Sequence, residues 1–398
     1  MYPSEDNPIQ IPAALREAAP RFASIRQRIH AHPELGADVP QTSALVAGLL
    51  REWGYTVHAV GGHGLVGQLK AGTGTRTIGL RADMDALPLQ ERTGLPYAST
   101  VGGRMHACGH DGHTATLLAA AEYLAATRNF DGTLNLIFQP DEEGLSGALA
   151  MMEDGLFERF PCDGIYAFHN APGLPLGAAV VQDGPLGGSS DRVTVTFRGR
   201  GGHGAMPNLA LDPTLAMAST VVALQGIVAR NVAPVDAAVI SVGQMHAGTT
   251  YNIIPETATL MLSVRATRTE VRDLLETRIR EVVTHQAAAH GLQADIRYDR
   301  LVPCIQNAVR ESAIARAAVA SVLGDARVIR VPPSSQLGSE DFAWMLEKMP
   351  GCYFALGNDL AGQPCVGCSL HNDGYDFNDK LIPIGAACWV ALVEQYLR

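Results

Sequence analysis

The chain has 398 residues, of which 47% are apolar and 18% are charged, and its net charge at pH 7 is −10. This composition is that of a folded globular protein, and the length exceeds what one ordinary hydrophobic core serves, so we expect two domains. The acidic balance and the absence of a basic run argue against nucleic acid as a partner.

The start of the chain and its cysteines bear on location. The first six residues, MYPSED, lack the basic region and apolar core of a signal peptide. No apolar run reaches the roughly 18 to 20 residues that span a bilayer, so no membrane partner is expected. Seven cysteines, an odd number and widely spread, do not resemble a secreted disulfide framework. These features predict a cytoplasmic protein.

Helical and strand patterns alternate in the first part of the chain. The patterns predict helices at 12–31, 43–53, 114–127 and 147–157 and strands at 55–60, 77–81, 133–138 and 164–168. This alternation indicates an α/β domain with a mostly parallel sheet.

Side chains that suit metal ions follow three of these strands. They are Asp83 and Asp85 after the strand at 77–81, Glu142 and Glu143 after the strand at 133–138, and His169 after the strand at 164–168. Because ligands collect at the carboxyl ends of strands in open α/β sheets, we expect these side chains to form one site.

The middle of the chain has a different pattern. It predicts strands at 191–199, 237–243, 258–265 and 293–298, with helices at 212–230 and 269–289. The order β-α-β-β-α-β is that of a ferredoxin-like unit. The α/β pattern resumes afterwards, so the predicted division is a discontinuous catalytic domain, 1–186 and 303–398, with an inserted ferredoxin-like α+β domain at 187–302.

Cys108 and His110 lie two positions apart, next to a predicted helix. A single C-x-H pair is a weak signal, since a buried cysteine beside a structural histidine is common. The helix that begins near Asp111 is expected to direct its positive end at the thiol and lower the thiol pKa, which favours the thiolate that a metal needs. His106 and His113 are expected to support the ligands rather than to bind metal.

Glu142 and Glu143 could form a solvated acidic turn, but they follow an apolar strand and precede Gly144. One could bind metal while the other serves as a base for water, and adjacency leaves open which does which. His169 and His371 are lone histidines, which are usually structural. Together with the other donors they would complete five ligands, enough for two metal ions. Zinc, manganese, cobalt and nickel all accept such ligands.

Two other motifs carry little weight. Residues 62–67 match G-x-G-x-x-G, but glycines and a further strand follow where a dinucleotide site needs a helix. Cys365 and Cys368 form a C-x-x-C pair without a second such pair, which indicates ordinary loop cysteines. No G-x-S-x-G elbow of a serine hydrolase occurs in the chain.

Four segments together resemble the M20 metallopeptidases, in particular the branch of hippurate hydrolases, N-acyl-amino-acid amidohydrolases and plant auxin-conjugate hydrolases. The segments are 81–88 (RADMDALP), 106–114 (HACGHDGHT), 142–144 (EEG) and 201–207 (GGHGAMP). The likeness runs from His30 to the C-terminal histidine. It implies a catalytic domain of zinc-peptidase-like architecture.

The resemblance also implies roles for single residues. Glu142 would be the general base, and His203 would stabilise the oxyanion in a partner subunit's site. Asp85 would orient the metal ligands, with Asp83 as the alternative carboxylate for this role. The two metal ions would be held by Cys108, His110, Glu143, His169 and His371. The inserted domain would form a homodimer or a dimer-based tetramer.

The chain departs from that family's pattern at a few positions. Asp141 stands where a small residue is usual, Asn372 follows His371 where paired histidines are common, and Gly204 and Asn208 replace alanine and histidine. None of these changes removes a proposed ligand, but Asp141 and the asparagines are expected near the substrate.

The expected function is hydrolysis of the amide bond of N-acyl amino acids, which are small-molecule substrates, with Glu142 assisting the attack of water. Two alternatives remain. One is an amidohydrolase with Cys108 as nucleophile and His110 as base. The other is a non-catalytic protein that binds metal or amino acids.

Overall fold

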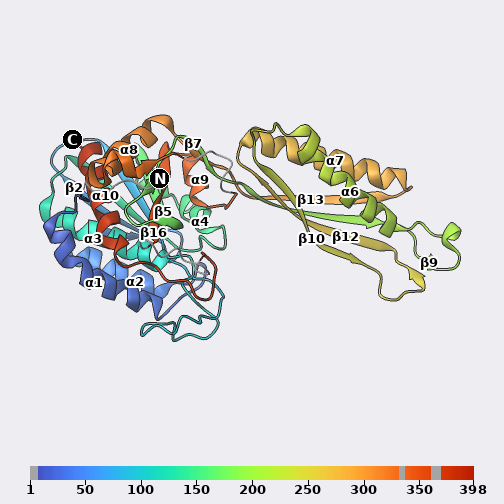
Figure 1. The fold of residues 1–398 in the computed structure, drawn as a ribbon, viewed down its shortest axis with the longest axis horizontal. Coiled ribbons are helices and arrows are strands. Elements are labelled where there is room, and N and C mark those ends of the chain that lie inside the picture. Colours follow the sequence, from blue (N-terminus) through green and yellow to red (C-terminus); the bar gives the residue numbers. More distant parts are fainter. Residues whose placement is uncertain (1–7, 331–336, 360–368) are drawn as a thin grey trace. The chain divides into compact units, whose positions relative to one another are not determined.

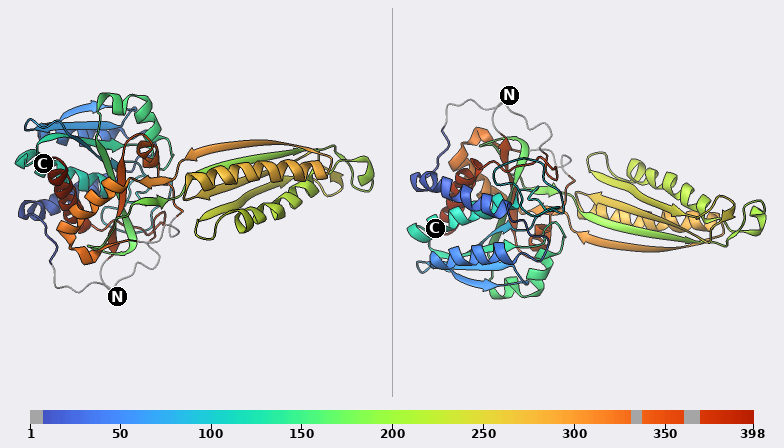
Figure 2. Two further views of the ribbon diagram at one scale, coloured as in Figure 1. Left: turned by 90° about the horizontal axis from the view of Figure 1, so that it is seen from above. Right: turned by 90° about the horizontal axis from the view of Figure 1, so that it is seen from below.

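The computed structural model describes residues 8–330, 337–359 and 369–398, so Cys365 and Cys368 lie outside the described residues. Its contacts divide the chain into two compact units. Unit 1 holds Met1–Gly184, Asn307–Val331 and Asp341–Arg398, as far as these are described, and unit 2 holds Pro185–Gln306 and the described part of Pro332–Glu340. Figures 1 and 2 show both units, coloured along the sequence.

Within the described part of unit 1, eight strands form one sheet in the order β1-β2-β4-β3-β5-β16-β6-β15. The neighbours β4, β3, β5 and β16 are parallel, whereas β1, β2 and β6 pair antiparallel with their inner neighbours. The predicted parallel centre is therefore confirmed. The strands are β1 (Thr56–Ala59), β2 (Leu65–Ala71), β3 (Thr77–Asp83), β4 (Gly132–Gln139), β5 (Gly164–Pro175), β6 (Ala179–Val180), β15 (Val328–Ile329) and β16 (Gly351–Asp359).

Helices cover both faces of this sheet. The helices of unit 1 are α1 (Ala13–His30), α2 (Pro40–Glu52), α3 (His110–Thr127), α4 (Gly147–Glu153), α5 (Leu156–Arg159), α8 (Val309–Leu323), the 3-10 helix η2 (Asp325–Arg327), α9 (Phe342–Leu346) and α10 (Leu381–Tyr396). On one face α3 and α10 pack on each other and on central strands, and α1 packs on both (Figure 1). Leu80 and Trp389 belong to the hydrophobic core of that face. Successive side chains of a strand point to opposite faces, so Arg81, which contacts Asp341 beside α9, marks the other face.

Two helix boundaries differ from the prediction because of glycines in the left-handed region. The helix expected at 114–127 begins at His110, since Gly109 has φ 95°. A Cβ at Gly109 would lie 2.5 Å from Oδ1 of Asn170, so the site requires glycine there. Gly155, with φ 82°, divides the helix expected at 147–157 into α4 and α5. Strand β2, rather than a helix, begins within the glycine motif at 62–67.

Unit 2 contains an antiparallel sheet with the order β10-β12-β8-β13 and two helices, α6 and α7, that pack on each other. This is the strand order of a ferredoxin-like fold, as predicted. Asp212 caps α6 by accepting a hydrogen bond from the Thr214 amide at 2.8 Å. The elements are β7 (Gly184–Gly187), β8 (Ser190–Arg198), β9 (Gly202–His203), η1 (Pro207–Leu209), α6 (Pro213–Asn231), β10 (Ala238–Ala247), β11 (Ile253–Ile254), β12 (Thr257–Ala266), α7 (Thr269–Ala289), β13 (Gln293–Val302) and β14 (Ile305–Asn307).

Helix α6 corrects the expectation that no segment has the length and composition of a membrane span. By these two criteria alone, its 19 residues suffice. Its alanines and valines give this hydropathy, but Ala216, Leu224 and Ile227 are buried in the core of unit 2. The helix therefore has the packing of a core helix with one face left exposed.

Candidate metal centre

The structure brings the predicted ligands together at one edge of the unit 1 sheet. Strands β3, β4 and β5 are parallel neighbours, so their carboxyl ends meet, and α3 begins at the same edge. His169 lies within β5, which continues to Pro175, rather than after the strand as expected. Among the described residues, three of the groups whose donor atoms all lie within 4.8 Å of one another contain only the predicted ligands and Glu142: Cys108, His110 and His169; Cys108, Glu143 and His371; and His110, Glu142 and Glu143.

His110 and His169 each present one ring nitrogen to this cluster because the other is engaged. Nδ1 of His110 lies 2.9 Å from the carbonyl oxygen of Asp85, and Nδ1 of His169 lies 2.7 Å from the carbonyl oxygen of Asn170. A neutral imidazole that donates from Nδ1 has its lone pair on Nε2. Nε2 of His169 lies 3.3 Å from Sγ of Cys108. Burial lowers the pKa of His169 to about 3, which keeps it in the neutral form that binds metal.

Glu143 and His371 form the other side of the cluster. Oε1 of Glu143 lies 3.2 Å from Nε2 of His371. His371 has φ 61°, a left-handed backbone that is uncommon outside glycine, and its amide donates to the Ala107 carbonyl at 2.8 Å. This bond joins the His371 segment to the residue before Cys108.

Asp85 orients both the glutamate turn and His110. Its two carboxylate oxygens accept the amides of Glu142 at 3.1 Å and of Glu143 at 3.2 Å. These bonds fix the backbone of the turn that carries the two glutamates. Glu142 is buried and lies in the group with His110 and Glu143.

Asp83 and His113 form a second layer behind the ligands. Oδ1 of Asp83 lies 2.6 Å from Nδ1 of His113, and Nε2 of His113 accepts from the Asn170 amide at 3.1 Å. Both ring nitrogens of His113 are therefore engaged, which fits a supporting residue. His106 is buried, and in the described part of the chain its ring nitrogens form no hydrogen bond, so it does not orient a ligand in this way.

Sequence reasoning missed a buried ionic network behind Asp83. Arg81 donates to Asp83 at 2.7 Å and to Asp341 at 3.3 Å, and Asp341 accepts from the Ala148 amide at 2.9 Å. This network links the site to α4 and α9. The only hint in the sequence is an arginine inside an otherwise apolar strand.

The pKa of the Cys108 thiol is shifted upward, opposite to the lowering that was expected. Burial raises the pKa of the Cys108 thiol well above its usual range, despite the opposing charge of His110. Desolvation of the thiolate is the largest cause of this shift. The thiolate form therefore requires a strong positive charge at the cluster, such as a metal ion.

Two of the unusual residues have local roles. The carboxylate of Asp141 bonds the Ser146 hydroxyl, and Asp141 has φ 57° in the turn before the glutamates. Oδ1 of Asn372 accepts from the Gly374 amide at 2.9 Å. Both side chains shape turns that hold ligands. Gly204 and Asn208 are exposed in unit 2.

His203 belongs to unit 2, whereas the predicted metal ligands belong to unit 1. It belongs to β9 and pairs with Ile253 of β11. Its side chain is exposed, and Nδ1 accepts from the Ala205 amide at 3.0 Å. The ring therefore carries its proton on Nε2 when neutral and can donate from there.

The donor set fits divalent first-row metal ions. Nε2 of His110 is completely buried and forms no hydrogen bond within the described residues. A buried imidazole nitrogen without a partner costs free energy, which a metal ligand bond would offset. Thiolate, imidazole and carboxylate are the donors that zinc and its neighbours prefer.

Comparison with known proteins agrees with this chemistry. The model of peptidase family M20/M25/M40 matches residues 79–395. The chain is 44% identical to a hippurate hydrolase of Campylobacter jejuni over 95% of this chain and 97% of that protein. It is 35% identical to the IAA-amino acid hydrolase ILR1-like 2 of Arabidopsis thaliana, over 95% and 85%.

The chain is also similar to a solved structure from the M20 family. The YXEP protein of Bacillus subtilis, a dinuclear metal-binding peptidase, superposes with a TM-score of 0.84 at 30% identity, covering 96% of this chain and 99% of that one. The family model spans most of the chain, and the fold and donor set agree with it. This chain therefore belongs to the peptidase family M20/M25/M40.

Proposed function

We propose that this chain hydrolyses the amide bond of N-acyl amino acids and releases a carboxylic acid and a free amino acid. The observation that carries the proposal is the convergence of thiol, imidazole and carboxylate donors beside the buried Glu142. The names of the relatives, a hippurate hydrolase and an IAA-amino acid hydrolase, support this substrate class.

Two divalent metal ions would be held by five residues. Cys108 belongs to two of these donor groups, so its thiolate would help to hold both ions. One ion would take His110 and His169 and the other Glu143 and His371. Zinc or manganese is the expected metal, and cobalt or nickel would also fit these donors.

When bound, the metal ions supply positive charge that polarises the scissile carbonyl and makes water a stronger acid. Glu142 accepts the proton of the attacking water and later delivers it to the leaving amine. Asp85 fixes the backbone of the turn that carries Glu142 and Glu143 by accepting hydrogen bonds from both amides. The carbonyl oxygen of Asp85 also holds Nδ1 of His110, which leaves Nε2 of His110 available to the donor cluster.

Unit 2 supports assembly as a homodimer or a dimer-based tetramer. Strand β10 is at an edge of its sheet, and the exposed apolar side chains Leu215 and Val222 lie on one face of α6. A second copy could pair along β10 and cover α6. We propose a location in the cytoplasm, which the odd number and wide spread of the seven cysteines support.

A panel of N-acetyl, N-benzoyl and indole-acetyl amino acids tests the proposed function. Metal-loaded protein is expected to release the free amino acid from at least one class, as measured by mass spectrometry. Protein dialysed against chelator should be inactive until metal is added. Equal activity of the metal-free protein would favour Cys108 as nucleophile, and inactivity of protein with two bound ions on the whole panel would favour a binding protein.

His203 is proposed to donate a hydrogen bond from Nε2 to the oxyanion in a partner subunit's site. Loss of one such donor typically costs about 2.7 to 4 kcal/mol, so His203→Ala should lower kcat about 10²- to 10³-fold without loss of metal. His285→Ala is the matched control, because His285 is an exposed histidine on α7 of the same unit.

Hybrid dimers test whether His203 acts across the dimer. When His203→Ala and Glu142→Gln subunits are mixed, a hybrid contains one site with both residues intact if His203 serves the partner. Recovered activity is therefore expected. Proven hybrids without recovered activity would assign His203 to its own subunit or to the fold alone.

A further inference from the structure

Arg26, on α1, is completely buried and reaches three carboxylates. Its guanidinium lies 3.4 Å from Asp111, 2.8 Å from Asp376 and 2.8 Å from Asp379. A buried guanidinium is costly unless it is paired and hydrogen-bonded, so these contacts are required for α1 to pack here. The planar group, with five donors, can bond several acceptors at once.

These three carboxylates belong to the two segments that carry metal ligands. Asp111 follows His110 in the first turn of α3. Asp376 and Asp379 follow His371 in the segment that leads into α10. Arg26 therefore joins the Cys108–His110 segment to the His371 segment from behind.

Other contacts make this junction rigid. Nδ1 of His30, one turn after Arg26, lies 2.8 Å from the carboxylate of Asp111. The hydroxyl of Tyr97 donates to Asp376 at 2.7 Å, and the amide of Gln27 donates to Asp379 at 2.8 Å. The acceptors of Arg26 thus have fixed places, and a shift of the guanidinium would move one segment relative to the other.

We infer that Arg26 is a positioning residue. It holds the His371 segment in place against the Cys108–His110 segment, so that the metal ion assigned to Glu143 and His371 binds tightly. The inference rests on the proposed metal site. Cys108 and His371 come from different segments and meet in one donor group. A displacement of His371 of about 1 Å would exceed the tolerance of metal-ligand distances, about 0.2 Å. Supporting partners of this kind are typically worth 10- to 100-fold in metal affinity.

Calorimetric titration of metal-free protein with Mn²⁺ tests this inference. Wild type is expected to bind two ions, and Arg26→Gln should bind one of them at least about tenfold more weakly. Arg26→Lys should restore the affinity only in part, because a lysine keeps the charge but not the fork of donors. The visible spectrum of the Co²⁺-loaded protein should change in the same variants, since it reports the ligand geometry.

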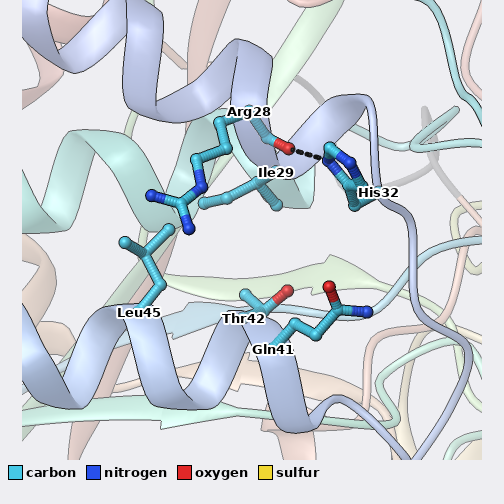
Figure 3. A pocket seen from close by; sticks show the side chains of 6 residues that line it. All are labelled: Arg28, Ile29, His32, Gln41, Thr42 and Leu45. Atoms are coloured by element: carbon cyan, nitrogen blue, oxygen red, sulfur yellow. Dashed lines mark hydrogen bonds between the residues drawn. The ribbon is translucent and has the colours of Figure 1, made fainter.

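Arg28→Gln is the matched control. Arg28 lies on the same helix but is exposed, where it lines a surface pocket with Ile29, His32 and Leu45 (Figure 3). This variant should bind both ions as wild type does. If Arg26 only stabilises the fold, Arg26→Gln would lower the melting temperature and leave both affinities unchanged, and that result would overturn the inference.

Two further outcomes can be distinguished: a variant that does not fold, and a wild type that does not bind two ions. Should Arg26→Gln fail to fold, Asp376→Asn and Asp379→Asn carry the test, because both side chains are partly exposed and tolerate the change more easily. The double variant should bind one of the two ions more weakly than wild type. Unchanged affinity for both ions would contradict the inference. Failure of wild type to bind two ions would instead contradict the proposed metal site.

Discussion

Cys108→Ala is expected to lose both metal and activity. Cys108 lies in the group with His110 and His169 and also in the group with Glu143 and His371, so its removal takes a donor from each. Loss of a supporting residue alone costs 10- to 100-fold in metal affinity. Loss of a shared ligand should therefore cost at least about 100-fold, and elemental analysis after gel filtration should find less than two ions per chain.

The metal content distinguishes metal-dependent hydrolysis from catalysis with Cys108 as the nucleophile. In that alternative Cys108→Ala is inactive too, but wild type would be active without metal. Cys162→Ala is the control, since Cys162 is also a buried free cysteine of unit 1 and is absent from the donor groups of the described residues. Full metal content and activity in Cys108→Ala would refute the proposed ligand set.

The sequence predicted those parts of the fold whose pattern is local. The alternation of apolar residues places β3 and β4 within two residues of their observed ends. Acidic residues at or just after the ends of these strands are at the site because parallel strands end at one edge. Asp83, Asp85 and the glutamate pair could therefore be found without a structure.

Backbone effects of single glycines were harder to predict. Nothing in the composition of residues 106–114 distinguishes a helix that begins at His110 from one that begins at Thr114. The close approach of Asn170 to Gly109 decides it, and Asn170 is distant in sequence. This start places His110 on the first turn of α3, next to Cys108.

Contacts between segments that are distant in the sequence could not be predicted from it. Arg26 resembles a solvated residue of an amphipathic helix, yet its partners Asp376 and Asp379 are about 350 positions away. Arg81 and Asp341 are a similar case. Charged residues are usually exposed, so a sequence pattern assigns them to the surface unless the fold supplies their partners.

Burial also explains the one reversed electrostatic prediction. The positive end of α3 was expected to lower the pKa of Cys108, but the thiol is removed from water and its pKa rises. The sequence shows the helix terminus but not the depth of the site. Burial of one side chain depends on how all neighbouring segments pack, which is a property of the whole fold.

Glu142→Gln is expected to keep both metal ions and to lose about 10²- to 10⁴-fold in kcat, the usual contribution of a positioned general base. The amide has nearly the same shape as the carboxylate, so the bonds from Asp85 to the backbone of the turn should persist. A glutamine cannot take the proton of water. Elemental analysis and steady-state kinetics on the best substrate of the panel measure the two effects.

Glu143→Gln is the matched comparison, because Glu143 is the adjacent carboxylate and differs in its contact with His371. A weaker ligand at this position should reduce metal content, and added metal should restore part of the activity. In Glu142→Gln added metal should restore nothing, since the base is missing rather than the ion. If Glu142→Gln loses metal while Glu143→Gln retains it, the two glutamates have exchanged roles, and the base is the residue that contacts His371.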